Sequence, residues 1–242
     1  MKKLFALVLL LCMALSLISG CTVKDPYDQY LAAMEKTEAM EQMQASISYT
    51  LSMNYNNFTL DITAFSEAKT TVVGGKSVNF QNVNMSFLGF TFESEWYDYE
   101  GFRYTSKSGV KTKGTIPEYD SGMSPLDFKK DDIISSTFEK VDKGSKYTVT
   151  LSGSIAEESL ADIFPFDDFL EIFGLNTNDG IMSSDVTMYF IIDKDGYISE
   201  FLLQYESTVT IDGAPFTFSM DISMSFVFGD VTIELPDFSE YV

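Results

Sequence analysis

The stretch "FTFSMDISMSF", residues 216–226, alternates apolar and polar side chains at every position. Strand side chains alternate between two faces, so one face of this strand carries the apolar members. They include Phe216, Phe218, Met220, Ile222 and Met224. Such a face either packs as ordinary core under a helix or lines a cavity for an apolar ligand. Met220 and Met224 slightly favour the second interpretation, because methionine is flexible and polarisable and suits an adaptable binding surface.

The same alternation recurs along most of the chain and predicts many long strands. The alternating runs are residues 45–55, 57–65, 84–99, 101–106, 136–141, 146–153, 185–192, 197–211 and 214–228. Glycine-containing turns at Gly74-Gly75, Glu100-Gly101, Asp142–Gly144, Asp195-Gly196 and Asp212-Gly213 separate several of these runs. Long alternating runs joined by such turns are typical of antiparallel hairpins. The pattern therefore predicts an antiparallel meander that curls.

Three segments have helical composition. Asp25-Pro26 is a typical helix start and predicts a helix over 26–43. Ser124-Pro125 opens a second segment that continues through "LDFKKDDII", residues 126–134. The third segment, 158–173, is rich in phenylalanine and includes Phe166, Phe169 and Phe173. It is either a buried helix or a lid over a cavity, with Pro165 and Gly174 as possible hinges.

These elements together predict an α+β fold. A sheet-on-sheet sandwich has no natural place for apolar helices, whereas a one-sided sheet does. We therefore expect a curved antiparallel β-sheet, a half-barrel, with helices packed on its concave face. Residues 26–242 would form a single domain of this kind, since no low-complexity linker divides them.

The first twenty residues are expected to be an export signal and not part of the fold. Lys2 and Lys3 precede an apolar run that is too short for a comfortable transmembrane helix. The run ends at Ile18-Ser19-Gly20-Cys21, which resembles the lipobox of bacterial lipoproteins. That resemblance implies cleavage before Cys21, a diacylglyceryl group on its sulfur and a short tether over 21–25. The alternative is a plain secreted protein with a chance cysteine.

Composition excludes several classes of function. The formal net charge of −20 repels nucleic acid, so we expect no nucleic-acid partner. Histidine is absent, and the two cysteines lie in the signal and at position 21. The exported domain thus lacks the residues of serine–histidine triads, cysteine nucleophiles and common zinc sites. We expect no metal, no cofactor and no enzyme. The alternative, a glycoside hydrolase, needs two facing carboxylates that no spacing here identifies.

The order of elements resembles the LolA-like half-barrel group, including the LolB and LppX/LprG-type lipoproteins. The resemblance rests on the lipobox, the helix "PYDQYLAAMEKTEAMEQ" leading into "ASISYTLSMNY", and the hairpin "MYFIIDKDGYISEFLLQY" at 188–205. It implies a cavity between half-barrel and helices that receives acyl chains or other lipids. The chain departs from the group in its acidity and in having no disulfide.

The sequence thus predicts an exported bacterial lipoprotein on the outer face of the cell membrane, typical of a Gram-positive organism. Acylated Cys21 would contact the bilayer. Phe216, Phe218, Met220, Ile222 and Met224 would line a site for an apolar or amphiphilic ligand, and Phe166, Phe169 and Phe173 would cap it. The alternative is a non-catalytic surface interaction or accessory lipoprotein with a solid core.

Overall fold

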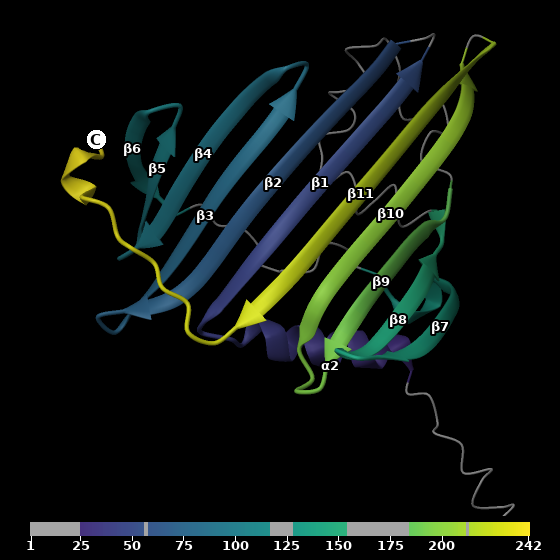
Figure 1. The fold of residues 1–242 in the computed structure, drawn as a ribbon, viewed down its shortest axis with the longest axis horizontal. Coiled ribbons are helices and arrows are strands. Elements are labelled where there is room, and N and C mark those ends of the chain that lie inside the picture. The colour runs from purple at the N-terminus through teal and green to yellow at the C-terminus, as the bar shows by residue number, and fades with distance from the viewer. Residues whose placement is uncertain (1–24, 56–57, 117–127, 154–183, 212) are drawn as a thin grey trace, which may run out of the picture.

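The computed structural model describes residues 25–55, 58–116, 128–153, 184–211 and 213–242. They form one antiparallel sheet in the order β6-β5-β4-β3-β2-β1-β11-β10-β9-β8-β7 (Figure 1). The strands are β1 (Met43–Tyr55), β2 (Phe58–Val73), β3 (Lys76–Phe87), β4 (Phe90–Tyr99), β5 (Phe102–Lys107), β6 (Val110–Thr115), β7 (Ile133–Val141), β8 (Gly144–Leu151), β9 (Val186–Asp193), β10 (Ile198–Ile211) and β11 (Ala214–Phe228). The α+β prediction of an antiparallel sheet with an inner-face helix is confirmed.

The sheet consists of two meanders that meet at its centre. Strands β1 to β6 form one meander and β7 to β11 the other, and β1 pairs with β11. This pairing aligns Met43 with Phe228 and Tyr55 with Phe216, so it is thirteen residues long without a shift. The two meanders are therefore joined at the sheet centre by the β1–β11 pair, and β6 and β7 are the free edges.

The helix α2 (Pro26–Glu38) lies behind the sheet in Figure 1 and defines what we call the inner face; the opposite side is the outer face. Asp25 caps the helix by accepting a hydrogen bond of 3.0 Å from the Tyr27 amide. The helix ends at Glu38, earlier than the predicted residue 43. Met43 instead opens β1, because its buried side chain contributes more to the sheet than to a helix that has no apolar stripe left.

Buried contacts fix α2 against one end of the sheet. The Tyr30 ring lies 5.1 Å from the Phe190 ring, measured between centroids. The Ile198 amide donates a hydrogen bond of 3.0 Å to Thr37 Oγ1, and that hydroxyl donates to the Ala33 carbonyl. These contacts place the helix beside the β9–β10 turn. Among the described residues, no helix is long and apolar enough to cross a membrane.

Two sequence predictions need correction. The run 84–99 is not one strand but two, because Leu88 and Gly89 form a turn with positive φ angles of 48° and 80°. The predicted helix from 124 is wrong over its described part. Residues 130–132 form a single 3₁₀ turn and β7 follows, since "IISSTFEKV" pairs with β8.

A second core lies on the outer face, beneath the C-terminal segment 229–242. By register, Val78, Tyr97 and Tyr104 project outward from β3, β4 and β5, and each is buried. The Phe238 ring stacks on Tyr104 at a centroid distance of 4.0 Å. Figure 1 shows the segment crossing in front of the sheet. Segment 229–242 therefore covers apolar side chains that project from the outer face, away from the inner-face core.

Candidate ligand-binding face

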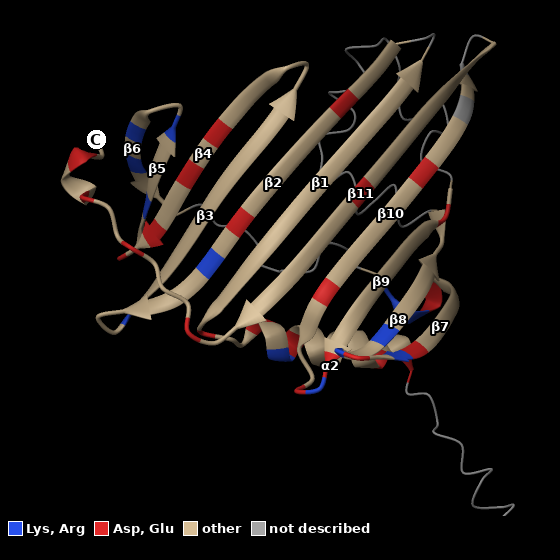
Figure 2. Cartoon of the chain, viewed as in Figure 1, with Lys and Arg blue, Asp and Glu red and all other residues tan. Residues whose placement is uncertain are grey.

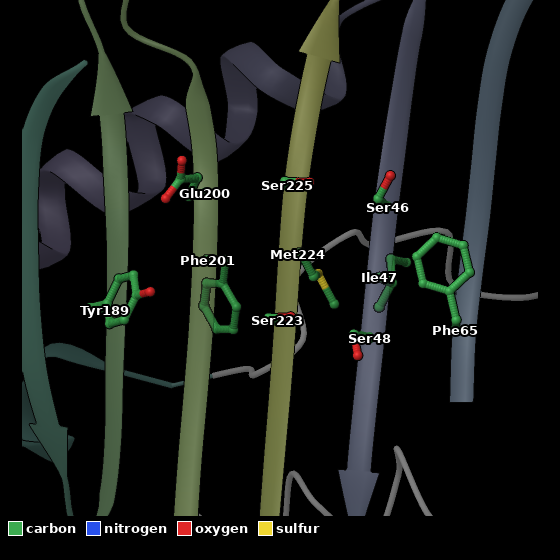
Figure 3. Close-up of a pocket in the computed structure, with 10 residues that line it drawn as sticks. All are labelled: Ser46, Ile47, Ser48, Phe65, Tyr189, Glu200, Phe201, Ser223, Met224 and Ser225. Carbon is green, nitrogen blue, oxygen red and sulfur yellow. The ribbon is translucent and has the colours of Figure 1, made fainter. Parts of the chain in front are cut away.

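The five residues singled out on β11 all lie on the inner face. They pair with apolar residues of β1: Phe216 with Tyr55, Phe218 with Met53, Met220 with Leu51, Ile222 with Tyr49 and Met224 with Ile47. Four of the five are buried, and Met224 is half-buried. Met224 also borders a hollow that opens on the outer face (Figure 3). Phe166, Phe169 and Phe173 lie outside the described residues, and the ligand-lining role of the whole set stays a prediction.

The register connects these residues to an apolar row that crosses six strands. In order the row is Tyr205, Met220, Leu51, Ile62, Phe87 and Phe90. Burial falls steadily along it. Tyr205 is 2% exposed, Ile62 and Phe87 are half-buried, and Phe90 is 66% exposed. The row therefore begins in the core and ends at the surface.

A second row runs parallel to the first, two residues along each strand. It consists of Leu203, Ile222, Tyr49, Ala64, Met85 and Phe92. Leu203 and Ile222 are fully buried, whereas Met85 is 38% and Phe92 is 44% exposed. Burial raises the pKa of Tyr49 in the middle of this row, as expected for a phenol surrounded by apolar groups.

We call the exposed end of the two rows the open patch: Met85, Phe90 and Phe92. Each member is at least 38% exposed. Sequence reasoning recognised this alternation as strand but did not assign it to the site. The signal was present in "MSFLGFTF", residues 85–92, where four alternating apolar side chains flank the turn. What the sequence lacked was the register that aligns them with Met220 and Ile222.

Charged residues are few along the central strands (Figure 2), and by register they all project from one face. Every charged residue of β2, β10 and β11 projects from the outer face: Asp61, Glu67, Lys69, Glu200, Glu206 and Asp221. The strand β1 has none. The inner face of the sheet centre is consequently free of charged side chains, as an apolar ligand requires.

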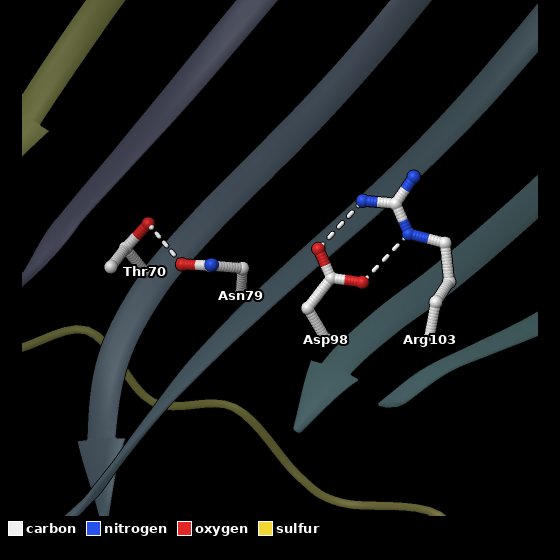
Figure 4. A network of polar contacts seen from close by, with 4 residues as sticks. All are labelled: Thr70, Asn79, Asp98 and Arg103. Atoms are coloured by element: carbon white, nitrogen blue, oxygen red, sulfur yellow. Dashed lines mark hydrogen bonds and ion pairs between the residues drawn. The ribbon is translucent and has the colours of Figure 1, made fainter. Parts of the chain in front are cut away.

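A row of polar side chains crosses the inner face near the other end of the strands. Thr70, Asn79, Asp98 and Arg103 form one cross-strand row (Figure 4). Thr70 Oγ1 donates to Asn79 Oδ1 at 3.0 Å, and Arg103 donates two hydrogen bonds of 2.7 and 2.6 Å to the Asp98 carboxylate. The Arg103 guanidinium also lies 5.5 Å from the Trp96 ring centroid. The inner face is thus amphipathic along the strands.

The described residues contain no group of three or more Asp, Glu, His or Cys side chains arranged to hold a metal ion. The Asp98 carboxylate on the inner face is held by Arg103 in a bidentate pair, with side-chain exposures of 10% and 21%. A carboxylate fixed in this way serves as a structural partner to the guanidinium.

No protein-family model matches the chain, and no curated protein sequence matches it. Similar solved structures include LprF from Mycobacterium bovis, with 13% identity, a TM-score of 0.37 and coverage of 86% of this chain and 95% of that one. A DUF1329 family protein from Desulfovibrio piger has 12% identity, a TM-score of 0.25 and coverage of 87% and 95%. A putative outer membrane lipoprotein-sorting protein domain from Vibrio parahaemolyticus has 10% identity, a TM-score of 0.24 and coverage of 86% and 93%. These neighbours include proteins of the group that the sequence pattern resembles.

Proposed function

We propose that this protein is an exported lipoprotein, held at the outer face of the cell membrane by acylated Cys21, that binds an apolar or amphiphilic ligand on its inner face. The observation that carries the proposal is the pair of apolar rows that run from the buried core into the open patch. A ligand seated there would continue the core outward over Phe90 and Phe92.

The energetic argument concerns the cost of leaving the open patch in water. Burying a phenylalanine or methionine side chain fully contributes about 1.5–3 kcal/mol, and the patch has three such side chains on the adjoining strands β3 and β4. Single exposed apolar residues are common, but contiguous ones mark binding surfaces. The inner face therefore offers an apolar ligand several kcal/mol of favourable contact.

The polar row at the other end suits an amphiphile better than a pure hydrocarbon. Acyl chains would lie over the open patch, and a polar group would reach toward Asn79 and the Asp98–Arg103 pair. Met224, half-buried at the edge of the predicted β11 face, would contact the ligand, while Phe216 and Phe218 would form the fixed wall behind it.

A second candidate function is a surface interaction module with a solid core. It is favoured by the near-complete burial of Phe216, Phe218 and Ile222, which are at most 2% exposed without any ligand. In that case the open patch would dock against a protein partner. We expect neither form to be catalytic.

The test is uptake of a neutral apolar dye, N-phenyl-1-naphthylamine, by the purified Cys21→Ser chain, followed by displacement with diacylglycerol. We expect saturable uptake that Phe92→Ser weakens about tenfold. The matched control is Phe65→Ser, because Phe65 is 48% exposed and lies on the outer face of β2. Uptake that is absent, or equally sensitive to both substitutions, would overturn the proposal and favour the solid-core module.

A further inference from the structure

A hollow of about 300 Å³ lies on the outer face at the sheet centre, on the side opposite the open patch (Figure 3). Its size is at the lower limit of ligand sites. Two register rows build it. One row contributes Phe65, Ser48, Ser223 and Tyr189 to the lining, and the other contributes Ser46, Ser225 and Glu200. Large side chains thus border a floor of small hydroxyl-bearing ones.

The two aromatic residues are the main features of this hollow. Phe65 is 48% exposed on the outer face. Tyr189 is half-buried, and Lys146 Nζ lies 4.5 Å from its ring centroid, which helps to hold the ring on the surface. Four strand spacings separate Phe65 from Tyr189, or about 19 Å. That length matches a short oligomer and exceeds a single small molecule.

The polar groups of the hollow have hydrogen-bonding capacity but little net charge. Within the described part of the chain, the hydroxyls of Ser46, Ser48, Ser223 and Ser225 have no side-chain partner, and each hydroxyl can both donate and accept. The carboxylate that lines the hollow, Glu200, is paired with Lys143. Glu67, which is next to Ser46 across the strands, is paired with Lys69 at 2.7 Å. The hollow therefore favours a ligand that is uncharged and rich in hydroxyl groups.

The fold also excludes other ligands. The hollow lies over the paired central strands β1 and β11, whose backbone groups already bond to each other, so a peptide cannot add there as a strand. The net charge of −20 opposes nucleic acid and polyanions. Pyranose rings offer apolar C–H faces that pack on aromatic rings and hydroxyls that match serine hydroxyls.

We propose that the outer-face hollow binds a neutral oligosaccharide chain. The chain would lie across the strands, with one sugar against Phe65, another against Tyr189 and the serine hydroxyls bonding to the units between them. This site is separate from the inner face. The protein would then hold a glycan on one side of its sheet and an amphiphile on the other, and neither activity requires the other.

The test is calorimetric titration of the purified Cys21→Ser chain with two uncharged tetrasaccharides, chitotetraose and cellotetraose, and with anionic tetragalacturonate. We expect at least one neutral tetramer to bind, and the anionic one to bind at least tenfold more weakly. Phe65→Ala and Tyr189→Ala should each weaken binding about tenfold.

The matched control is Phe92→Ala, a similarly exposed phenylalanine on the inner face, which should leave saccharide binding unchanged while weakening dye uptake. All three positions are at the surface or half-buried, so circular dichroism should show an intact fold. Failure of both neutral tetramers to bind at millimolar concentration would overturn the proposal. Binding that survives both aromatic substitutions would do the same.

Discussion

Met220 and Leu51 face each other across the β11–β1 ladder on the inner face, and each side chain is 5% exposed. They stand at the buried beginning of the row that ends at Phe90. Because neighbouring protein side chains already enclose Met220, its truncation leaves a cavity. We expect Met220→Ala to lower the free energy of unfolding by about 2–5 kcal/mol, measured by urea denaturation.

The control for this substitution is Ser219→Ala, which lies next to Met220 but projects from the outer face. It should change stability by less than about 0.5 kcal/mol. A Met220→Ala variant as stable as the control, with altered dye uptake, would show that Met220 borders a ligand cavity and is not packed core.

The anchor is tested at the two cysteines of the leader region. Cys21→Ser removes the sulfur that would carry the diacylglyceryl group, so the protein should appear in the medium or accumulate as uncleaved precursor. Cys12→Ser, inside the apolar run, should leave the protein in the membrane fraction. Membrane-bound, normally processed Cys21→Ser protein would contradict lipidation.

Thr37 should be a sensitive position in the contact between α2 and the sheet. Its buried hydroxyl accepts the Ile198 amide and donates to the Ala33 carbonyl. Thr37→Val keeps the shape but leaves the buried Ile198 amide without its acceptor, which should cost about 1–3 kcal/mol in unfolding experiments. Thr37→Ser retains the hydroxyl and should lose much less. Equal losses for valine and serine would mean that packing, not the hydrogen bond, fixes the helix.

The outer-face core predicts a loss of stability at high pH. Burial, followed by the nearby Glu95 and Tyr241, raises the pKa of Tyr97 to about 12, from an ordinary value of 10.0. The folded state favours the neutral phenol, so this contribution is present below pH 10 and is lost as the pH rises from about 10 toward 12. Tyr97→Phe should remove that part of the pH dependence, as followed by urea denaturation across this range.

The C-terminal segment gives an independent check on the same group. Phe238 contacts both Tyr97 and Tyr104. Phe238→Ala should expose Tyr97 to water and shift its phenolate absorbance to lower pH. An unchanged titration would show that the segment is not the source of the burial that raises this pKa.

Several features of the fold followed directly from local sequence. The alternation in residues 216–226 is a property of neighbouring residues, so the identity of the inner-face side chains of β11 could be derived without a partner strand. The Asp25-Pro26 helix start and the Asp195-Gly196 turn are equally local. The prediction from sequence was wrong where a turn lies within an alternating run. Leu88-Gly89 has an apolar residue where a turn usually has a polar one, and its positive φ angles were hidden within an alternating run.

Only the tertiary structure decided which part of the inner face is covered. Phe218 and Phe92 belong to similar alternating patterns, yet Phe218 is 1% and Phe92 is 44% exposed. The difference depends on strand register and on what packs above each strand, which residues far apart in sequence determine. The same holds for the outer face, where segment 229–242 buries Tyr104 and the register brings Phe65 into one row with Tyr189. Alternation tells which side a residue faces, but burial is a property of the assembled neighbours. Those neighbours can come from opposite ends of the chain, as Met43 of β1 and its partner Phe228 of β11 do.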